Sequence, residues 1–221
     1  FSETFAAIGC AEYYKATGLA EAKERAIALF DKMIYYYTTP GVFPPKVNPE
    51  TRKTRGHSMV MIMMNVAQCV REIHNDPKYD ELIAQCLDTI MNVFIKPEEK
   101  ALFETVGVNG ERLDNPDGRF INPGHSMETA WFMMKEAIVR RDREIMNRSM
   151  EVLLWSLERG WDKEYGGILY FMDCLGNPPE AYEHDMKLWW PHNEALIASM
   201  MIYRDTKDEK YLDIFYQILD Y

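Results

Sequence analysis

His125 and Glu128, whose side chains can exchange protons, lie three positions apart. On a helix this spacing places both side chains on one face, one turn apart. An imidazole exchanges protons near neutral pH, and a carboxylate can orient it or bind hydroxyl groups. A neutral imidazole near a helix N-terminus also feels a positive potential that opposes its protonation. We therefore expect His125 to be a base and Glu128 to orient it or bind substrate. The alternative is a hydrogen-bonded core histidine.

A second stretch, residues 189–194, reads Trp-Trp-Pro-His-Asn-Glu. Proline favours the first helical turn, so we expect a helix over 191–205 with both tryptophans just before it. Trp190 and Glu194 share a face if Trp190 itself lies in the first turn. An aromatic wall beside the His192 imidazole and the Glu194 carboxylate suits a sugar, whose C–H faces stack and whose hydroxyls hydrogen-bond. The alternative is that the tryptophans are core residues and the polar residues cap the helix.

Hydrophobic periodicity predicts pairs of helices joined by short turns, and each pair is followed by a longer connection. Residues 40–55 and 96–122 read as long connections, the second with short extended pieces. Residues 161–171 read as a turn and a short strand. The predicted helices cover 2–17, 21–37, 57–74, 77–95, 124–140, 142–159, 191–205 and 208–221.

The helix pairs form a repeat. The tetrapeptide Gly-His-Ser-Met occurs at 56–59 and again at 124–127. His57, His125 and His192 follow one another at intervals of 68 and 67 residues, and each marks the start of a first helix. Hairpins that cannot bury an apolar face alone must stack or close into a ring. We therefore expect an all-α array of about four hairpins whose histidines meet at one end.

Composition limits the kinds of partner that the protein is expected to bind. The formal net charge of −10 and the lack of a basic run argue against a nucleic-acid surface. No apolar stretch is long enough to span a membrane, and no signal peptide is recognisable. The four cysteines lack metal-binding spacing, which favours reduced, buried thiols in a cytoplasmic protein. His-x-x-Glu lacks the second histidine of a zincin helix, so we predict no metal site.

Two motifs carry a family resemblance. Asn-Pro-Gly-His-x-x-Glu-x-x-Trp at 122–131 and Met-Lys-Leu-Trp-Trp-Pro-His-Asn-Glu-Ala at 186–195 resemble the N-acylglucosamine 2-epimerase family, the renin-binding proteins of animals. Residues 1–5 and 160–171 fit the same pattern, so the resemblance covers essentially the whole chain. It implies an (α/α)6 barrel with its site in a funnel at one end. Since six hairpins of about 65 residues need about 390, we expect residues 1–221 to be a single, incomplete barrel domain.

The resemblance also implies roles for individual residues. It makes His125 one catalytic histidine and Glu194 a glutamate that supports catalysis. The residues implied to bind the sugar are His57, Asn122, Glu128, Trp190 and His192. A second catalytic histidine in the family's final hairpin and an arginine in its first have no counterpart here. We therefore expect the chain as given to lack full activity.

The implied reaction interconverts N-acyl-D-glucosamine and N-acyl-D-mannosamine through removal and return of the C2 proton. The implied small-molecule partner is an amino sugar. The resemblance leaves open whether the protein forms a homodimer. No cofactor is required, although family members imply ATP as an allosteric activator. One rival is a related aldose or cellobiose 2-epimerase or an aldose–ketose isomerase. Others are a glycoside hydrolase that uses Glu128 and Glu194 as acid and base, and a non-catalytic protein of the renin-binding type.

Overall fold

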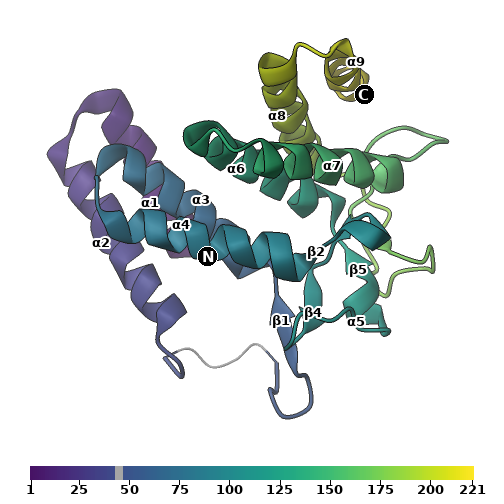
Figure 1. Cartoon of the computed structure of the whole chain (residues 1–221), viewed down its shortest axis with the longest axis horizontal. Helices are drawn as coiled ribbons and strands as arrows, with labels where there is room; N and C mark the ends of the chain where they lie inside the picture. Colours follow the sequence, from purple (N-terminus) through teal and green to yellow (C-terminus); the bar gives the residue numbers. More distant parts are fainter. Residues whose placement is uncertain (43–46) are drawn as a thin grey trace. The chain divides into compact units, whose positions relative to one another are not determined.

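Consecutive helices pack as pairs in the computed structural model, which describes residues 1–42 and 47–221 (Figure 1). Short turns join the two helices of each pair. The pairs are α1 (Ser2–Thr17) with α2 (Ala20–Thr38), α3 (Ser58–Ile73) with α4 (Pro77–Thr89), α6 (Pro123–Arg140) with α7 (Arg143–Gly160), and α8 (Trp189–Thr206) with α9 (Glu209–Leu219). This order confirms the predicted hairpins.

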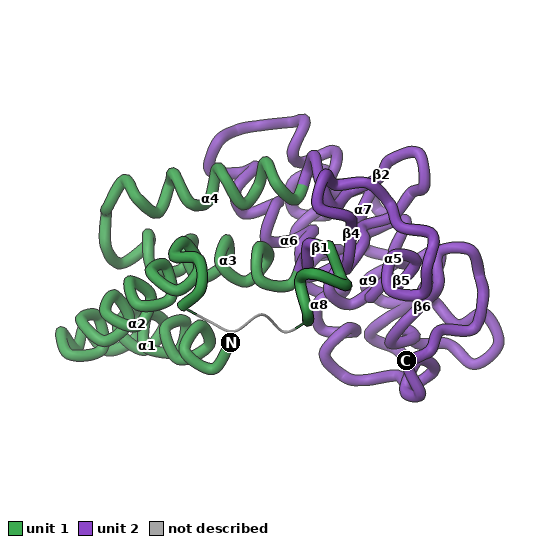
Figure 2. Tube along the Cα trace, turned by 90° about the horizontal axis from the view of Figure 1, so that it is seen from below, with its two compact units in different colours: residues 1–54, 58–90 green, residues 55–57, 91–221 purple. Residues whose placement is uncertain are grey.

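The chain divides into two compact units, coloured separately in Figure 2. The first unit comprises residues 1–54 and 58–90 and contains α1 to α4. Within it, α1 packs against both α2 and α3, and α3 packs against α4. Met63 and Met64 are fully buried, and α3 is apolar around most of its surface, as expected of a buried helix.

The second unit comprises residues 55–57 and 91–221, and it holds the predicted site residues. Within it, α6 packs against α7 and α8, and α8 packs against α9. Short strands fill its long connections. β2 (Ile95–Lys96) pairs with β3 (Ala101–Leu102), and β5 (Phe120–Ile121) pairs with β6 (Met172–Asp173), both antiparallel. β4 (Thr105–Gly107) pairs with β1 (Thr54–Gly56), of which residues 55 and 56 belong to this unit, and a one-turn helix, α5 (Pro116–Arg119), precedes β5.

Most helix boundaries lie within two residues of the prediction, and two differences bear on the local structure. The fourth helix ends at Thr89 and continues as a π-helical turn, Ile90–Phe94. The helix does not continue to residue 95, because the carbonyl of Phe94 accepts a hydrogen bond from the backbone N–H of Phe103. The antiparallel pairing of β2 with β3 begins at the next residue. The eighth helix begins at Trp189, so both tryptophans lie inside its first turn. Pro191 still falls where its missing N–H leaves no intrahelical bond unmade.

The structure agrees with some of the predictions for the connections between helix pairs and differs from others. The short extended pieces expected within 96–122 are present as strands. Residues 161–171 form a turn closed by a bridge between Trp161 and Ile168, and the strand itself follows at Met172–Asp173. The predicted 40–55 loop lies partly outside the described residues, at 43–46. Whether the chain is a single domain and part of a longer one stays a prediction.

Two expectations from composition concern cysteines and membranes. The four cysteines are free thiols, and three of them are buried. Across residues 1–42 and 47–221, none of the helices combines the length and the apolar character required to cross a bilayer.

One prediction concerns the turn before α7. The Asp142 carboxylate accepts hydrogen bonds from the backbone N–H groups of Glu144 and Ile145, at 2.9 and 3.2 Å. Asp142→Ala removes this cap and is expected to lower the free energy of unfolding by about 1 kcal/mol. Urea unfolding measures the loss. Asp142→Asn, which keeps a capping oxygen, is the matched control. Equal stability of both variants would contradict the assignment.

Candidate active site

The first turn of α6 places His125. Asn122 is the N-cap, and its side-chain oxygen accepts the backbone N–H of His125 at 3.1 Å. Its carbonyl also accepts the N–H and the hydroxyl of Ser126, each at 3.0 Å. Pro123 supplies the fixed φ angle that suits a first helical position. Asn122 is only 1% exposed, so in this structure its polar groups hold the helix start.

A buried carboxylate, Glu104, contacts the imidazole of His125. Glu104 Oε1 lies 3.0 Å from His125 Nδ1 and 3.6 Å from His57 Nδ1. Glu104 lies between β3 and β4, in a connection that joins no predicted motif. Sequence reasoning missed this residue. The available signal was a single charge inside the otherwise uncharged run 101–108, because a carboxylate in such a run needs partners when it is buried.

The pKa of His125 is shifted upward, opposite to the direction that the helix N-terminus alone favours. Burial by itself would lower the pKa of His125, but the negative charge of Glu104 and the hydrogen bond to it raise that pKa. Glu128 and Glu194 add to the increase. A full charge at contact distance therefore outweighs the partial charge of the helix N-terminus. The orienting contact also comes from Glu104, not from Glu128.

Two further carboxylates, Glu128 and Glu194, face His125. Burial raises the pKa of Glu128 to about 7, and the charge of Glu194 contributes to the increase. Burial also raises the pKa of Glu194, partly offset by a 2.6 Å hydrogen bond donated by the Trp131 indole N–H. Trp131 is the second residue that the sequence reading left without a role. Burial thus raises the pKa of both carboxyl groups, and only Glu194 has an indole donor that favours its ionised form.

Trp190 forms an aromatic wall beside His125. Their ring centroids are 5.4 Å apart, and the planes meet at 37°. The edge of Trp190 lies against Gly124, where an added Cβ would stand 2.5 Å from the ring. Tyr170 meets Trp190 edge-on at 6.0 Å. Trp189 is 76% exposed, so the alternative of two core tryptophans does not hold for it.

The other two repeat histidines are buried and have protein partners. His57 is fully buried, and its Nε2 lies 3.2 Å from the hydroxyl of Thr129. The Nδ1 atom of His192 contacts the carbonyl of Leu188 at 2.6 Å, and its Nε2 accepts the N–H of Ile168 at 2.9 Å. His57 and His125 therefore meet at Glu104, whereas both ring nitrogens of His192 are used by the backbone.

The sequence comparison decides the family. The sequence model described as N-acylglucosamine 2-epimerase matches residues 1–221. The chain belongs to this family. N-acylglucosamine 2-epimerase from Rattus norvegicus is 32% identical, and the enzyme from Bos taurus is 33% identical, each over 226 aligned residues. These alignments cover 100% of the chain but 54% and 53% of those proteins. The chain thus spans about half the length of the curated relatives it matches.

Solved structures confirm the fold class of this epimerase-family chain. Cellobiose 2-epimerase from Bacillus thermoamylovorans superimposes with a TM-score of 0.81 at 17% identity, covering 99% of the chain and 58% of that enzyme. A D-mannose isomerase gives 0.76 at 17% identity, covering 99% and 57%. The GH76 α-mannanase of Bacteroides thetaiotaomicron gives 0.75 at 15% identity, covering 99% and 59%. The helical hairpins are therefore those of an (α/α)6 barrel fold.

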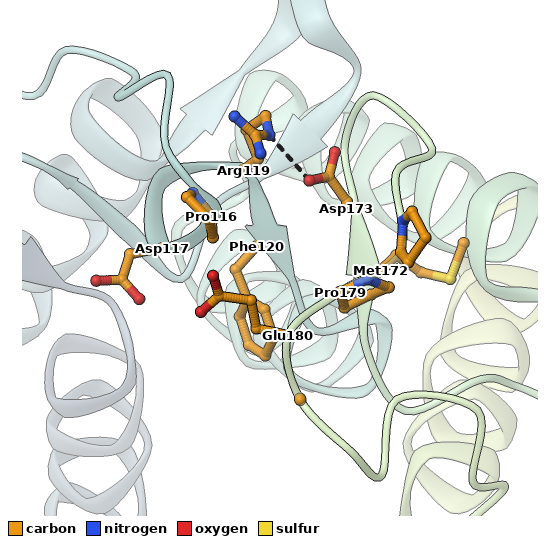
Figure 3. A pocket seen from close by; sticks show the side chains of 10 residues that line it. Pro116, Asp117, Arg119, Phe120, Met172, Asp173, Pro179 and Glu180 are labelled. Atoms are coloured by element: carbon orange, nitrogen blue, oxygen red, sulfur yellow. Dashed lines mark hydrogen bonds and ion pairs between the residues drawn. The ribbon is translucent and has the colours of Figure 1, made fainter.

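A cavity of about 390 Å³ lies elsewhere in the second unit of the epimerase-family chain (Figure 3). Arg119, on its wall, is held by Asp173 at 2.9 Å, the dashed line in Figure 3. None of the predicted site residues lines it. The lining residues are Pro116, Asp117, Arg119, Phe120, Met172, Asp173, Pro178, Pro179, Glu180 and Ala181. Within the described ranges, no group of three or more His, Cys, Asp or Glu residues could hold a metal ion.

The raised pKa of Glu128 predicts a pH-dependent stability. The folded protein binds this proton more tightly than the unfolded chain does. Stability is therefore lost as the pH rises from the ordinary value of 4.5 to about 7. Glu128→Gln should raise Tm above pH 7 and leave it nearly unchanged below pH 4.5. Thermal unfolding at both ends measures this, with the exposed-site variant Glu24→Gln as control. A Tm difference independent of pH would refute the assignment.

Proposed function

We propose that the protein is a sugar 2-epimerase that interconverts N-acyl-D-glucosamine and N-acyl-D-mannosamine. The observation that carries the proposal is the cluster around His125 in a chain of this family. One ring nitrogen of His125 contacts a buried carboxylate, and its ring lies beside Trp190. Because the chain spans about half of its relatives, the activity is proposed for the full-length protein.

The chemistry requires a proton carrier beside C2. Removing the proton α to the open-chain aldehyde gives an enediolate, and a proton returned to the opposite face inverts C2. His125 Nδ1 is held by Glu104, so Nε2 is the atom that exchanges the proton. Family resemblance assigns the opposite face to a histidine that has no counterpart in this chain.

The two other carboxyl groups have distinct tasks in this proposal. Glu128, which keeps its proton up to about pH 7, donates a hydrogen bond to the developing oxyanion. Glu194, held by Trp131, accepts hydrogen bonds from sugar hydroxyls and supports the cation formed on His125. Glu194 has an indole donor that favours its ionised form, whereas burial and the charge of Glu194 favour the protonated form of Glu128, and such unequal environments suit an acid–base site.

The remaining predicted residues enter the proposal in two ways. Trp190, half-buried beside His125, stacks on the sugar. Asn122, His57 and His192 are buried and bonded to protein groups, so we assign them to shaping the sugar site through their neighbours. Activation by ATP, a homodimer, a cytoplasmic location and the lack of a nucleic-acid partner belong to the same proposal. They rest on family resemblance and on the acidic composition.

The substrate is tested by isotope exchange. N-acetylmannosamine, mannose and cellobiose are each offered to the full-length protein in D2O, and deuterium at C2 is read by NMR. We expect exchange with the N-acyl sugar, because abstraction of the C2 proton exposes the carbanion to solvent deuterons. Exchange with cellobiose alone would identify a cellobiose epimerase, such as the relative from Dictyoglomus turgidum, which is 20% identical. Release of reducing ends would indicate a hydrolase, and no reaction at all a binding protein.

The catalytic histidine is tested by His125→Gln in the full-length protein. Loss of a general acid–base group should slow C2 exchange by about 10²- to 10⁴-fold. The matched control is His184→Gln, since His184 lies in the connection before α8 and in no described contact with the cluster. Equal loss in both variants, or full activity of His125→Gln, would remove His125 from the mechanism.

A further inference from the structure

Glu104 is held in place along its main chain as well as through its side chain. Its carbonyl accepts the backbone N–H of His57 at 2.9 Å, and its own N–H donates to the carbonyl of Phe120 at 3.4 Å. The side chain is only 13% exposed. The carboxylate therefore has a fixed location beside two imidazoles and little access to water.

The donors and acceptors around His57 determine which of its ring nitrogens carries a hydrogen. The Thr129 hydroxyl donates its single hydrogen to the carbonyl of His125, at 2.7 Å. Its oxygen can then only accept from His57 Nε2, 3.2 Å away, so His57 carries a hydrogen on that nitrogen. His57 Nδ1 has no hydrogen-bond partner among the described residues and lies 3.6 Å from Glu104 Oε1. The close contact of Glu104 is thus the one with His125.

Matching donors with acceptors also determines the tautomer of His125. An ionised carboxylate only accepts hydrogen bonds, so Nδ1 of His125 must carry the hydrogen that points at Glu104. Neutral His125 then has its lone pair on Nε2. A ring held in this way presents the same atom to a bound molecule before and after each proton transfer.

We propose that Glu104 is the positioning residue of the active site, which keeps the Nδ1–H of His125 directed into the protein and its Nε2 free for the sugar. This inference rests on the proposed function for the proton that Nε2 carries. His57 and Thr129 complete the arrangement: the backbone N–H of His57 donates to the carbonyl of Glu104, and its Nε2 reaches the carbonyl of His125 through the Thr129 hydroxyl.

The charges around His125 make the role measurable. The groups that face it are Glu104, Glu128 and Glu194, and Glu104 has the largest effect of the three in raising its pKa. Burial would raise the pKa of Glu104, but interactions with His125 and His57 lower it instead, so Glu104 is ionised wherever His125 titrates. Removing this one charge should move the acid limb of the rate profile to lower pH.

The test compares Glu104→Gln with wild type in the full-length protein. The glutamine still accepts the Nδ1–H but carries no charge. We expect NMR titration of His125 to move down by about one pH unit or more. We also expect kcat for C2 exchange to fall roughly tenfold or more, with KM nearly unchanged. Glu136→Gln, which removes a buried carboxylate paired with Arg140 on the same helix, is the control and should leave the His125 titration in place.

Each outcome separates the two proposals. An unchanged His125 titration in Glu104→Gln would overturn the positioning role, even if activity fell. If that variant does not fold, imidazole nitrogen shifts of the wild type decide: a neutral His125 with hydrogen on Nδ1 supports the role, and hydrogen on Nε2 overturns it. If the tautomer and the titration are as expected but no sugar exchanges, the proposed function fails and the positioning contact stands.

Discussion

The burial of the Glu104 carboxylate is the constraint on which the site depends. An isolated charge away from water is strongly unfavourable, so it persists only beside cations or hydrogen-bond donors. His125 supplies the close donor at 3.0 Å, and His57 borders the same oxygen at 3.6 Å. The burial of Glu104 therefore depends on the same imidazole to which the proposed reaction assigns the proton transfer. His57 and His125 belong to two successive hairpins of the repeat. Both lie beside the one negative charge of Glu104, so hydrophobic packing is not the only interaction between these hairpins.

Periodicity and repetition predicted much of this arrangement. Apolar spacing located the helix pairs, and the recurrent Gly-His-Ser-Met placed His57 and His125 at equivalent helix starts. His125, Trp190 and Glu194 could be proposed because their motifs are local, and the structure places Trp190 and Glu194 near His125. Glu104 was missed because its partner His125 is 21 residues away, across strand pairs too short to show a pattern. Trp131 was left aside for the same reason, since its contact with Glu194 crosses 63 residues.

The errors share a physical origin: each used a local rule where a tertiary contact decides. The helix N-terminus opposes protonation of His125 with only a partial charge, which the nearby carboxylate outweighs. The repeat suggested that His192 would resemble the other two histidines. Instead its ring joins the carbonyl of Leu188 to the N–H of Ile168, because a backbone acceptor and a backbone donor lie within hydrogen-bond reach of its two nitrogens.

Gly124 gives the wall beside His125 an unexpected dependence. The indole of Trp190 occupies the volume that any side chain at position 124 would need. Even a methyl group there would have to displace the ring, and the imidazole beside the indole would then be more exposed to water. Dielectric screening would rise, and the three carboxylates would influence His125 less. The exposure of His125, and with it the basicity of its imidazole, thus depends on a residue that has no side chain.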